Sequence, residues 1–177
     1  MKINLLKVVF AILILFSFDH SFSHGPSRQK VSESIEINND AGSVWKIVKN
    51  FTEFNWNPDI SKIEANSNEI GSERTINFTD GSSVVQQLEK INEEKKMIGW
   101  RIKKTDNKVL PVNSYAAKVF VKSTKAGSSL VTYKAGFYRG YMANDPPVEL
   151  NDENSKKKVS KFIKKSLDGL KKIAEKN

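Results

Sequence analysis

The chain has 177 residues, no cysteine, two histidines and a formal net charge of +9 at neutral pH. The lack of cysteine excludes disulfides, cysteine nucleophiles and thiolate metal sites, and two histidines are too few for most catalytic or metal-binding arrangements. A chain of this length forms one ordinary domain, and its positive charge favours acidic partners such as an acidic protein, anionic lipid or nucleic acid.

The start of the chain follows the pattern of a secretory signal peptide. A lysine precedes an apolar stretch over residues 5–16, which is too short for a spanning helix because such a helix needs about 20 residues. Small residues before His24 predict cleavage after Ser23. We therefore expect a signal peptide over residues 1–23, a disordered N-terminus over residues 24–29 and a periplasmic or secreted protein. An uncleaved membrane anchor is the alternative.

The next segment predicts one strand followed by two short helices. Residues 30–38 alternate between apolar and polar side chains, as a half-buried strand does. Asp40 can cap a helix over residues 41–48. The aromatic residues of segment 51–56 predict a second, tighter helical piece, which Pro58 ends.

From residue 60 onward the apolar residues recur with a period of two. Strands are expected over residues 60–64, 74–78, 84–91, 97–103, 115–123 and 130–138. Asp80-Gly81 and the turn at Gly127 are typical of hairpins. Strands at such regular spacing predict an antiparallel meander. Residues 136–150 show no clear period beyond the last strand and are expected to form a loop.

A long amphipathic helix is predicted at the end of the chain. Between Val159 and Ala174 the apolar residues fall at three- and four-residue spacings, and lysines fill the other positions. Asp152 and Glu153 lie near its start, where the helix dipole favours acids. A curved antiparallel sheet has one face that must be covered, and this helix can cover it. The space between a curled sheet and one helix often holds a ligand.

This order of elements resembles the SRPBCC (START/Bet v 1-like) superfamily, and short motifs resemble its polyketide cyclase/dehydrase-like branch. The motifs that carry the resemblance are Val44-Trp45, Phe51, Trp56, Pro58, Gly71, Arg74-Thr75-Ile76, Asp80-Gly81, Leu110-Pro111-Val112 and Tyr115. The resemblance implies an α+β domain of helix-grip fold over residues 30–177. A curved antiparallel sheet of six or seven strands would wrap around the long C-terminal helix, with two short helices after the first strand.

Within that branch the chain looks most like the MxaD-like periplasmic proteins, which are associated with methanol oxidation. The signal peptide, the loop around residues 144–147 and the basic helix carry this finer resemblance. It implies an accessory role in the meeting of methanol dehydrogenase with its cytochrome, because complementary charge raises encounter rates. The superfamily also includes lipid carriers, hormone receptors and aromatase/cyclases, so the fold alone does not decide the function.

Arg74 is the polar residue that says most about a possible ligand. It shares a strand face with Ile76 and Phe78, and these mark the face as buried. A buried arginine needs an anion or several acceptors. Arg74 therefore pairs with a buried glutamate, holds a ligand carboxylate or reaches water at the sheet's end. The full set of expected cavity residues is Arg74, Ile76, Phe78, Gln86, Trp100, Tyr115, Tyr133, Phe137 and Tyr141. The aromatic segment 137–142 is either a gate to this cavity or a loop packed on the helix.

Nine lysines lie between Lys156 and Lys176. On a helix they form either a solvated face or a docking patch for an acidic periplasmic protein. The docking candidates are Lys157, Lys161, Lys164, Lys165, Lys171 and Lys172. We expect no nucleic acid partner for a secreted protein, and membrane contact through lysines alone is weak and sensitive to salt.

The sequence offers no recognisable catalytic or metal-binding arrangement. After cleavage His24 would be the one remaining histidine, and a copper or zinc site needs further ligands that the chain lacks. A Ser/His/Asp arrangement and a phosphate-binding glycine loop are also missing. We therefore expect no metal and no cofactor, and a non-catalytic accessory or binding protein with an apolar cavity. A carrier of a hydrophobic ligand or lipid, and a cyclase- or hydrolase-like enzyme, are the alternatives.

Overall fold

The computed structural model describes residues 25–124 and 127–176; the expected signal peptide, residues 1–23, lies outside them. The described elements are β1 (Gln29–Ile37), α2 (Ala41–Val48), β2 (Ile60–Ala65), β3 (Glu73–Phe78), β4 (Ser83–Asn92), β5 (Met97–Thr105), β6 (Val112–Ser123), β7 (Ser129–Arg139), the 3-10 helix η2 (Val148–Leu150) and α3 (Asp152–Ala174). None of the helices in these two ranges is both long enough and apolar enough to cross a membrane.

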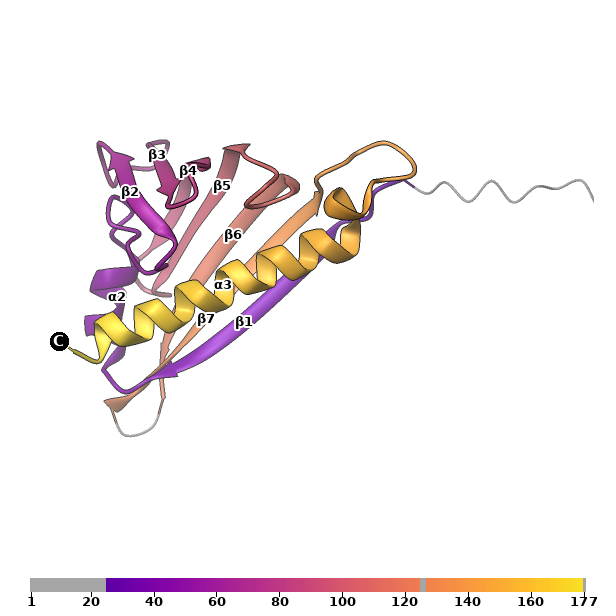
Figure 1. Ribbon diagram of the computed structural model, residues 1–177. Helices are drawn as coiled ribbons and strands as arrows, with labels where there is room; N and C mark the ends of the chain where they lie inside the picture. Colours follow the sequence, from indigo (N-terminus) through magenta and orange to yellow (C-terminus); the bar gives the residue numbers. More distant parts are fainter. Residues whose placement is uncertain (1–24, 125–126, 177) are drawn as a thin grey trace, which may run out of the picture.

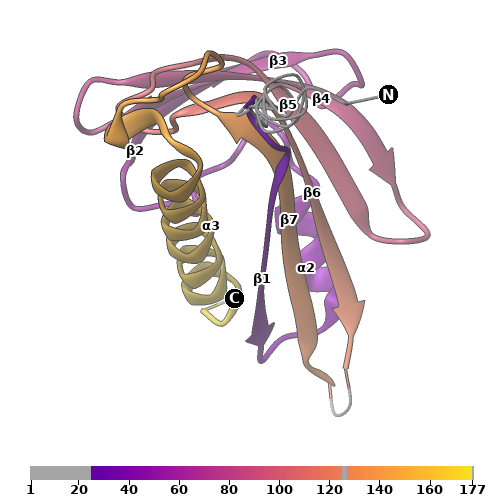
Figure 2. The same ribbon diagram turned by 90° about the vertical axis from the view of Figure 1, so that its right-hand side faces the viewer.

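The strands form one antiparallel sheet of seven in the order β1-β7-β6-β5-β4-β3-β2. Strands β2 to β7 are neighbours in chain order, and β1 joins the sheet beside β7. The long helix α3 runs across the concave face (Figure 1). In Figure 2 the sheet bends around α3, with β1 and β7 beside the helix and β2 and β3 above it. These features confirm the predicted helix-grip fold.

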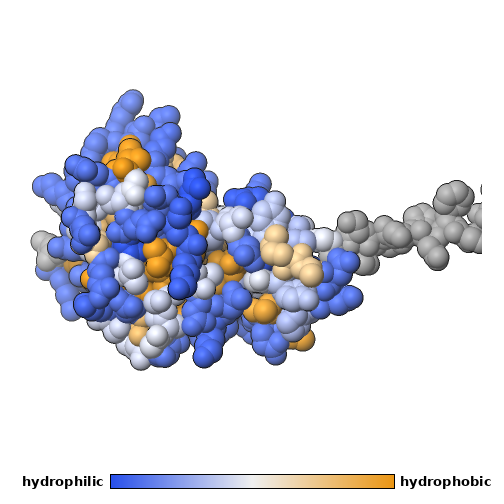
Figure 3. Space-filling model, turned by 90° about the horizontal axis from the view of Figure 1, so that it is seen from above, coloured by the Kyte–Doolittle hydropathy of each residue, from blue (hydrophilic) through white to orange (hydrophobic). Residues whose placement is uncertain are grey.

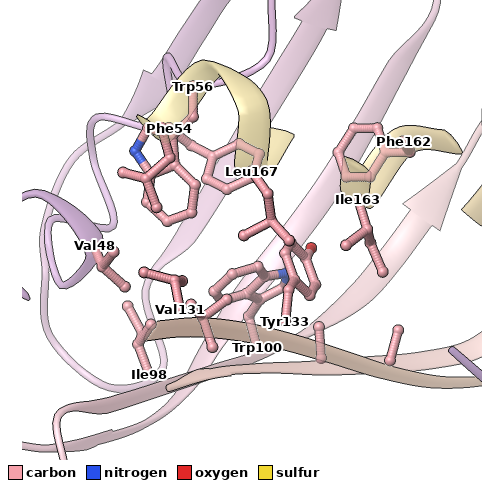
Figure 4. Packing of buried hydrophobic residues seen from close by; sticks show 14 of the residues in the cluster. Val48, Phe54, Trp56, Ile98, Trp100, Val131, Tyr133, Phe162, Ile163 and Leu167 are labelled. Carbon is pink, nitrogen blue, oxygen red and sulfur yellow. The ribbon is translucent and has the colours of Figure 1, made fainter. Parts of the chain in front are cut away.

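The core lies between the concave face and α3. On β7 the odd-numbered side chains, including Val131 and Tyr133, are buried, and the even-numbered ones point outward. On α3 the buried residues recur at helical spacing and include Ile163 and Leu167. Figure 4 shows these side chains meeting between strand and helix. Each large apolar side chain buried here contributes about 1.5–3 kcal/mol to folding, and this burial holds the helix on the sheet.

Segment 51–58 forms turns and not the second short helix that the sequence predicted. One reason is that the side chain of Asn57 takes a backbone N–H that a continuing helix would use. The side chain of Asn57 accepts from the backbone N–H of Asp59 at 3.0 Å and donates to the carbonyl of Phe162 on α3 at 3.3 Å. Asparagine side chains that compete in this way for backbone groups disfavour helix.

The N-terminal segment was expected to be disordered up to residue 29, but its last residues are held on the sheet. Gln29 begins β1. Arg28 donates to the carbonyl of Gly136 at 3.3 Å, and its guanidinium lies 5.6 Å from the ring centre of Tyr138. The domain therefore starts slightly earlier than position 30, because these contacts extend the β1–β7 pairing.

Candidate functional site

Eight of the nine predicted cavity residues lie in the interior, on strands β3 to β7. The buried eight are Arg74, Ile76, Phe78, Gln86, Trp100, Tyr115, Tyr133 and Phe137. Tyr141 does not join them, because it is 38% exposed in the loop after β7. The alternation of inward and outward residues along each strand accounts for the eight, and this loop residue has no such alternation to place it.

The loop after β7 is held by Arg139, which the sequence analysis did not single out. Its guanidinium donates to the carbonyl oxygens of Tyr141 at 2.7 Å and Ala143 at 2.9 Å, and to a carboxylate oxygen of Asp152 at 2.9 Å. Arg139 continues the inward-facing series of β7, which was the available signal. The bonds fasten the loop to the start of α3, so of the two interpretations of segment 137–142 they favour a packed loop over a gate.

Arg74 is almost fully buried and has neutral partners. Its Nε and Nη2 donate to Oε1 of Gln86 at 2.9 and 2.7 Å, and Nη1 donates to the carbonyl of Phe51 at 2.9 Å. The guanidinium also lies 4.1 to 4.8 Å from the ring centres of Phe51, Phe54 and Trp100. Of the three interpretations of Arg74, pairing with a glutamate is wrong, because the residue opposite it on β4 is a glutamine. Reaching water is wrong too, because the side chain is buried.

The charge of Arg74 has no carboxylate to balance it within the described residues. None of their ion pairs includes it. Burial lowers the pKa of Arg74 to about 9, and the nearby Tyr133 and Tyr115 act in the opposite direction. The guanidinium is therefore charged at neutral pH. The aromatic rings around it stabilise the cation but do not neutralise it.

Two tyrosines and a tryptophan complete the buried polar group. The hydroxyls of Tyr115 and Tyr133 lie 3.2 Å apart. Burial raises the pKa of Tyr133 to about 12 and the pKa of Tyr115 well above its ordinary value of 10. The ring of Trp100 meets Tyr133 edge-on at 5.5 Å, and its buried indole N–H lies near the hydroxyl of Tyr133 and acts to lower the pKa of that group. These groups can donate hydrogen bonds, but the phenols are not deprotonated at neutral pH.

An open pocket of about 310 Å³ lies beside this buried cluster, between α3 and the ends of β2, β3 and β5. We call it the helix pocket. Its lining consists of Asp59, Phe78, Thr79, Asp80, Lys108, Val109, Lys158, Lys161, Phe162 and Lys165. In Figure 3, hydrophilic residues (blue) predominate on the upper side of the molecule, and hydrophobic ones (orange) show mainly between them.

The helix pocket combines an aromatic wall with a basic rim. Phe78 and Phe162 meet edge-on at 6.1 Å. Of the two acids, Asp59 pairs with Lys165 at 2.5 Å, and hydrogen bonds from Ser82 lower the pKa of Asp80. The rim retains three further lysines, at positions 108, 158 and 161, so the pocket is net positive.

Aromatic side chains connect the helix pocket to Arg74. Phe162 lies 6.4 Å from Phe54, centre to centre, and Phe54 lies under the guanidinium of Arg74. Figure 4 shows Trp100 and Tyr133 beneath Leu167, with Phe54 and Phe162 on opposite sides. The buried cluster of Arg74, Trp100, Tyr115 and Tyr133, which we call the inner cluster, is thus connected to the pocket through the rings of Phe54 and Phe162.

The family follows from comparison with known proteins. Residues 28–175 match the family model described as polyketide cyclase/dehydrase and lipid transport. The chain belongs to this family. No curated protein matches the chain closely enough to add a more specific assignment.

Solved structures support the same fold for this family member. An uncharacterised protein from Bacillus thuringiensis superposes with a TM-score of 0.69 at 22% identity, over 82% of this chain and 98% of its own. The protein XoxI from Bacillus cereus gives 0.68 at 22%, covering 81% and 94%. The Zhui aromatase/cyclase from Streptomyces sp. R1128 gives 0.67 at 13%, covering 85% and 95%. At identities this low, the likeness shows the fold alone.

The lysines predicted for partner docking are divided between several roles in this family member. Lys161 and Lys165 line the helix pocket. Lys164 lies 3.8 Å from Glu33, and Lys171 lies 3.5 Å from Glu175. The last two candidates, Lys157 and Lys172, are exposed near opposite ends of α3. The helix therefore bears dispersed charge, and its use as a docking patch stays a prediction.

Two of the basic rim residues, Lys108 and Lys158, were not among the predicted site residues. Lys108 belongs to the turn between β5 and β6, and only the fold brings that turn next to α3. Lys158 was one of nine lysines with nothing to distinguish it. Across residues 25–124 and 127–176, no three His, Cys, Asp or Glu side chains are grouped so that they could hold a metal ion.

Proposed function

We propose that this protein binds a small amphipathic anion without transforming it, in the helix pocket. The observation that carries the proposal is that Phe78 and Phe162 lie beside three rim lysines, at positions 108, 158 and 161, that form no ion pair within the described residues. The rings favour an aromatic or aliphatic body, and the lysines favour a carboxylate, sulfonate or phosphate at its end. A volume of about 310 Å³ lies at the lower end of small-molecule pockets, so the ligand is small.

Arg74 provides a second, inner place for negative charge. A ligand that displaces the ring of Phe162 toward solvent and then that of Phe54 would reach the guanidinium, which lacks a carboxylate partner among the described residues. The hydroxyls of Tyr115 and Tyr133 and the indole N–H of Trp100 lie in the same cluster as further donors. This arrangement supports binding of an acidic group and gives a reason for a buried cation.

The chemistry of the cluster favours binding over catalysis. A general base works best with a pKa near the operating pH. Burial raises the pKa of Tyr133 to about 12, and it raises the pKa of Tyr115 well above its ordinary value of 10. The buried titratable groups are thus suited to donating hydrogen bonds to an anion and poorly suited to proton abstraction.

Calorimetric titration of the purified protein with naphthoate, and with the uncharged naphthalenemethanol, tests this proposal. We expect naphthoate to bind more tightly, and Lys158→Gln/Lys161→Gln to weaken naphthoate about tenfold with little effect on the alcohol. Lys157→Gln/Lys172→Gln removes the same charge elsewhere on α3 and serves as the control. Equal weakening by both double variants, or equal binding of acid and alcohol, would overturn the proposal.

A second candidate is an accessory protein outside the cytoplasm that meets an acidic redox partner, as the MxaD-like resemblance implies for methanol dehydrogenase and its cytochrome. The observation that favours it is the net charge of +9, with many lysines exposed. Mixing the protein with such an enzyme and cytochrome should give binding that weakens steeply with salt. Failure to bind at low salt would remove this candidate and leave the ligand proposal intact.

A further inference from the structure

The convex face of the sheet, opposite α3, is hollowed by a furrow of about 660 Å³ that crosses β1, β7, β6, β5 and β4. Its floor is formed at Gly99, Ala116 and Gly136, which occupy outward positions on three neighbouring strands. An exposed strand position commonly bears a larger side chain. A β-carbon at Gly136 would lie 3.0 Å from the guanidinium of Arg28, and one at Gly99 would lie 3.3 Å from the side chain of Lys118. These two cations therefore lie over the floor of the hollow, which we call the outer furrow.

The cations of the outer furrow lie opposite one another. Lys118 on β6 faces Lys134 on β7 in the strand register, and Lys90 and Lys30 border the same hollow. None of these four lysines forms an ion pair within the described part of the chain. Like charges directly opposite on adjacent strands destabilise a sheet. Lys134 lies 5.7 Å from the ring centre of Phe120, and this weak cation–π contact offsets only part of the repulsion.

Acidic side chains do little to offset these charges. Glu89 is the one carboxylate among the residues that line the outer furrow, and Arg101 pairs with it. A neighbouring hollow of about 600 Å³ shares Lys134 and continues toward the β6–β7 hairpin, where Phe120 and Leu130 add apolar contacts. The basic surface thus runs along the sheet beyond the furrow itself.

We propose that the outer furrow docks an extended acidic segment of a partner protein. Five strands span about 19 Å, which is the length of roughly six extended residues. The lysine heads supply complementary charge, and Arg28 and Lys118, which lie over the glycines of the floor, place cations where acidic side chains would meet them. A membrane is a poorer match, because an interfacial surface needs apolar side chains that enter the lipid alongside its cations. This inference is independent of the helix pocket and rests on the second candidate function only in requiring an acidic partner.

Fluorescence anisotropy with a labelled peptide of alternating glutamate and serine tests the inference. We expect Lys118→Gln/Lys134→Gln to weaken peptide binding about tenfold. Ala116→Ile should also weaken it, since it fills the furrow without changing the charge and places a β-branched residue in an exposed strand position. Lys157→Gln/Lys172→Gln, which removes two charges from α3, should leave peptide binding nearly unchanged.

Several outcomes would overturn the inference. They are no binding by the unaltered protein, equal weakening by the two lysine pairs, and no effect of Ala116→Ile. Vesicles of phosphatidylglycerol that displace the peptide and depend on Lys118 and Lys134 would assign the face to a membrane instead. Naphthoate binding by the same variants is expected to be unchanged, so a failure here is distinguishable from a failure of the helix pocket. If an acidic redox enzyme binds the furrow variants as tightly as the unaltered protein, the accessory function is supported and the docking role of the outer furrow is overturned.

Discussion

The two faces of the sheet hold their positive charges in opposite ways. On the concave face a single guanidinium, that of Arg74, is enclosed by aromatic rings and hydrogen bonded to Gln86. On the convex face Lys118 and Lys134 lie opposite each other in the open. The enclosed cation is part of the packed core, whereas the exposed lysines repel each other and have one ring contact, that of Lys134 with Phe120 at 5.7 Å. The first face thus carries the packing of the core, and the second leaves its charges open to solvent.

The concave face is closely packed against α3, and at Gly169 on this helix there is no room for a side chain. A β-carbon at this position would lie 1.5 Å from the carbonyl oxygen of Trp56. We expect Gly169→Ala to destabilise the protein by about 4 kcal/mol, or to prevent folding, because backbone atoms cannot move aside cheaply. Urea unfolding followed by tryptophan fluorescence measures the effect. Asp168→Ala, at an exposed neighbouring position, is the control, and a similar small change in both would contradict the packing described here.

The next largest change in the free energy of unfolding is expected for variants around the buried guanidinium of Arg74. Gln86→Leu would leave Arg74 without its main acceptor, and we expect a loss of about 3 kcal/mol. Arg74→Met combined with Gln86→Leu should recover most of that loss, because an apolar pair of similar size removes both the charge and its need for a partner. Unfolding free energies of the two single variants and the double variant give the coupling. Additive losses would show that Arg74 does not depend on Gln86.

Alkaline pH should weaken the concave face through its tyrosines. The pKa of Tyr133 is about 12 in the folded protein and near 10 when unfolded. Its neutral form is therefore favoured by folding, so the stabilisation is fully present below pH 10 and is lost as the pH rises toward 12, by about 1.4 kcal/mol per pH unit. Comparing the unaltered protein with Tyr133→Phe isolates this term from that of Arg74. Parallel pH profiles for the two proteins would contradict it.

Removing charge from the convex face should stabilise the protein, whereas the changes to the concave face destabilise it. The effect should also be smaller. Lys118→Gln/Lys134→Gln removes a like-charge pair, and we expect unfolding to become harder by about 0.5 kcal/mol at low salt. The gain should shrink at high salt, because screening weakens the repulsion. Urea unfolding at two salt concentrations measures both. A clear loss of stability would show that these lysines serve the fold and would weaken the case for a docking surface.

Sequence periodicity was enough to predict most of the fold, because each strand and the long helix carry their own local signal. The inward direction of Arg74 followed from Ile76 and Phe78 on the same face. Its partner did not, because the pairing of Arg74 with Gln86 depends on the register between β3 and β4. The turns near Asn57 were missed for a similar reason, since its side chain bonds to α3, more than a hundred residues away.

The candidate site was predicted only in part. The inner cluster came from strand alternation, and its members lie together as expected on one face. The helix pocket was not predicted, because it combines a turn after β5 with one face of α3. The outer furrow had a readable signal, since Lys118 and Lys134 stand at outward positions of adjacent predicted strands. These two positions indicate a shared basic surface only once β6 and β7 are known to be neighbours in the sheet.

Amide chemical shifts of the isotopically labelled protein, recorded during titrations with naphthoate and then with the acidic peptide, test the division between the two faces most directly. We expect naphthoate to move the signals of Phe78, Lys161 and Phe162, and the peptide to move those of Gly99 and Lys134. Two separate sets of shifts would support a ligand face and a partner face on one sheet. A single shared set, or naphthoate shifts on the convex strands, would contradict that division.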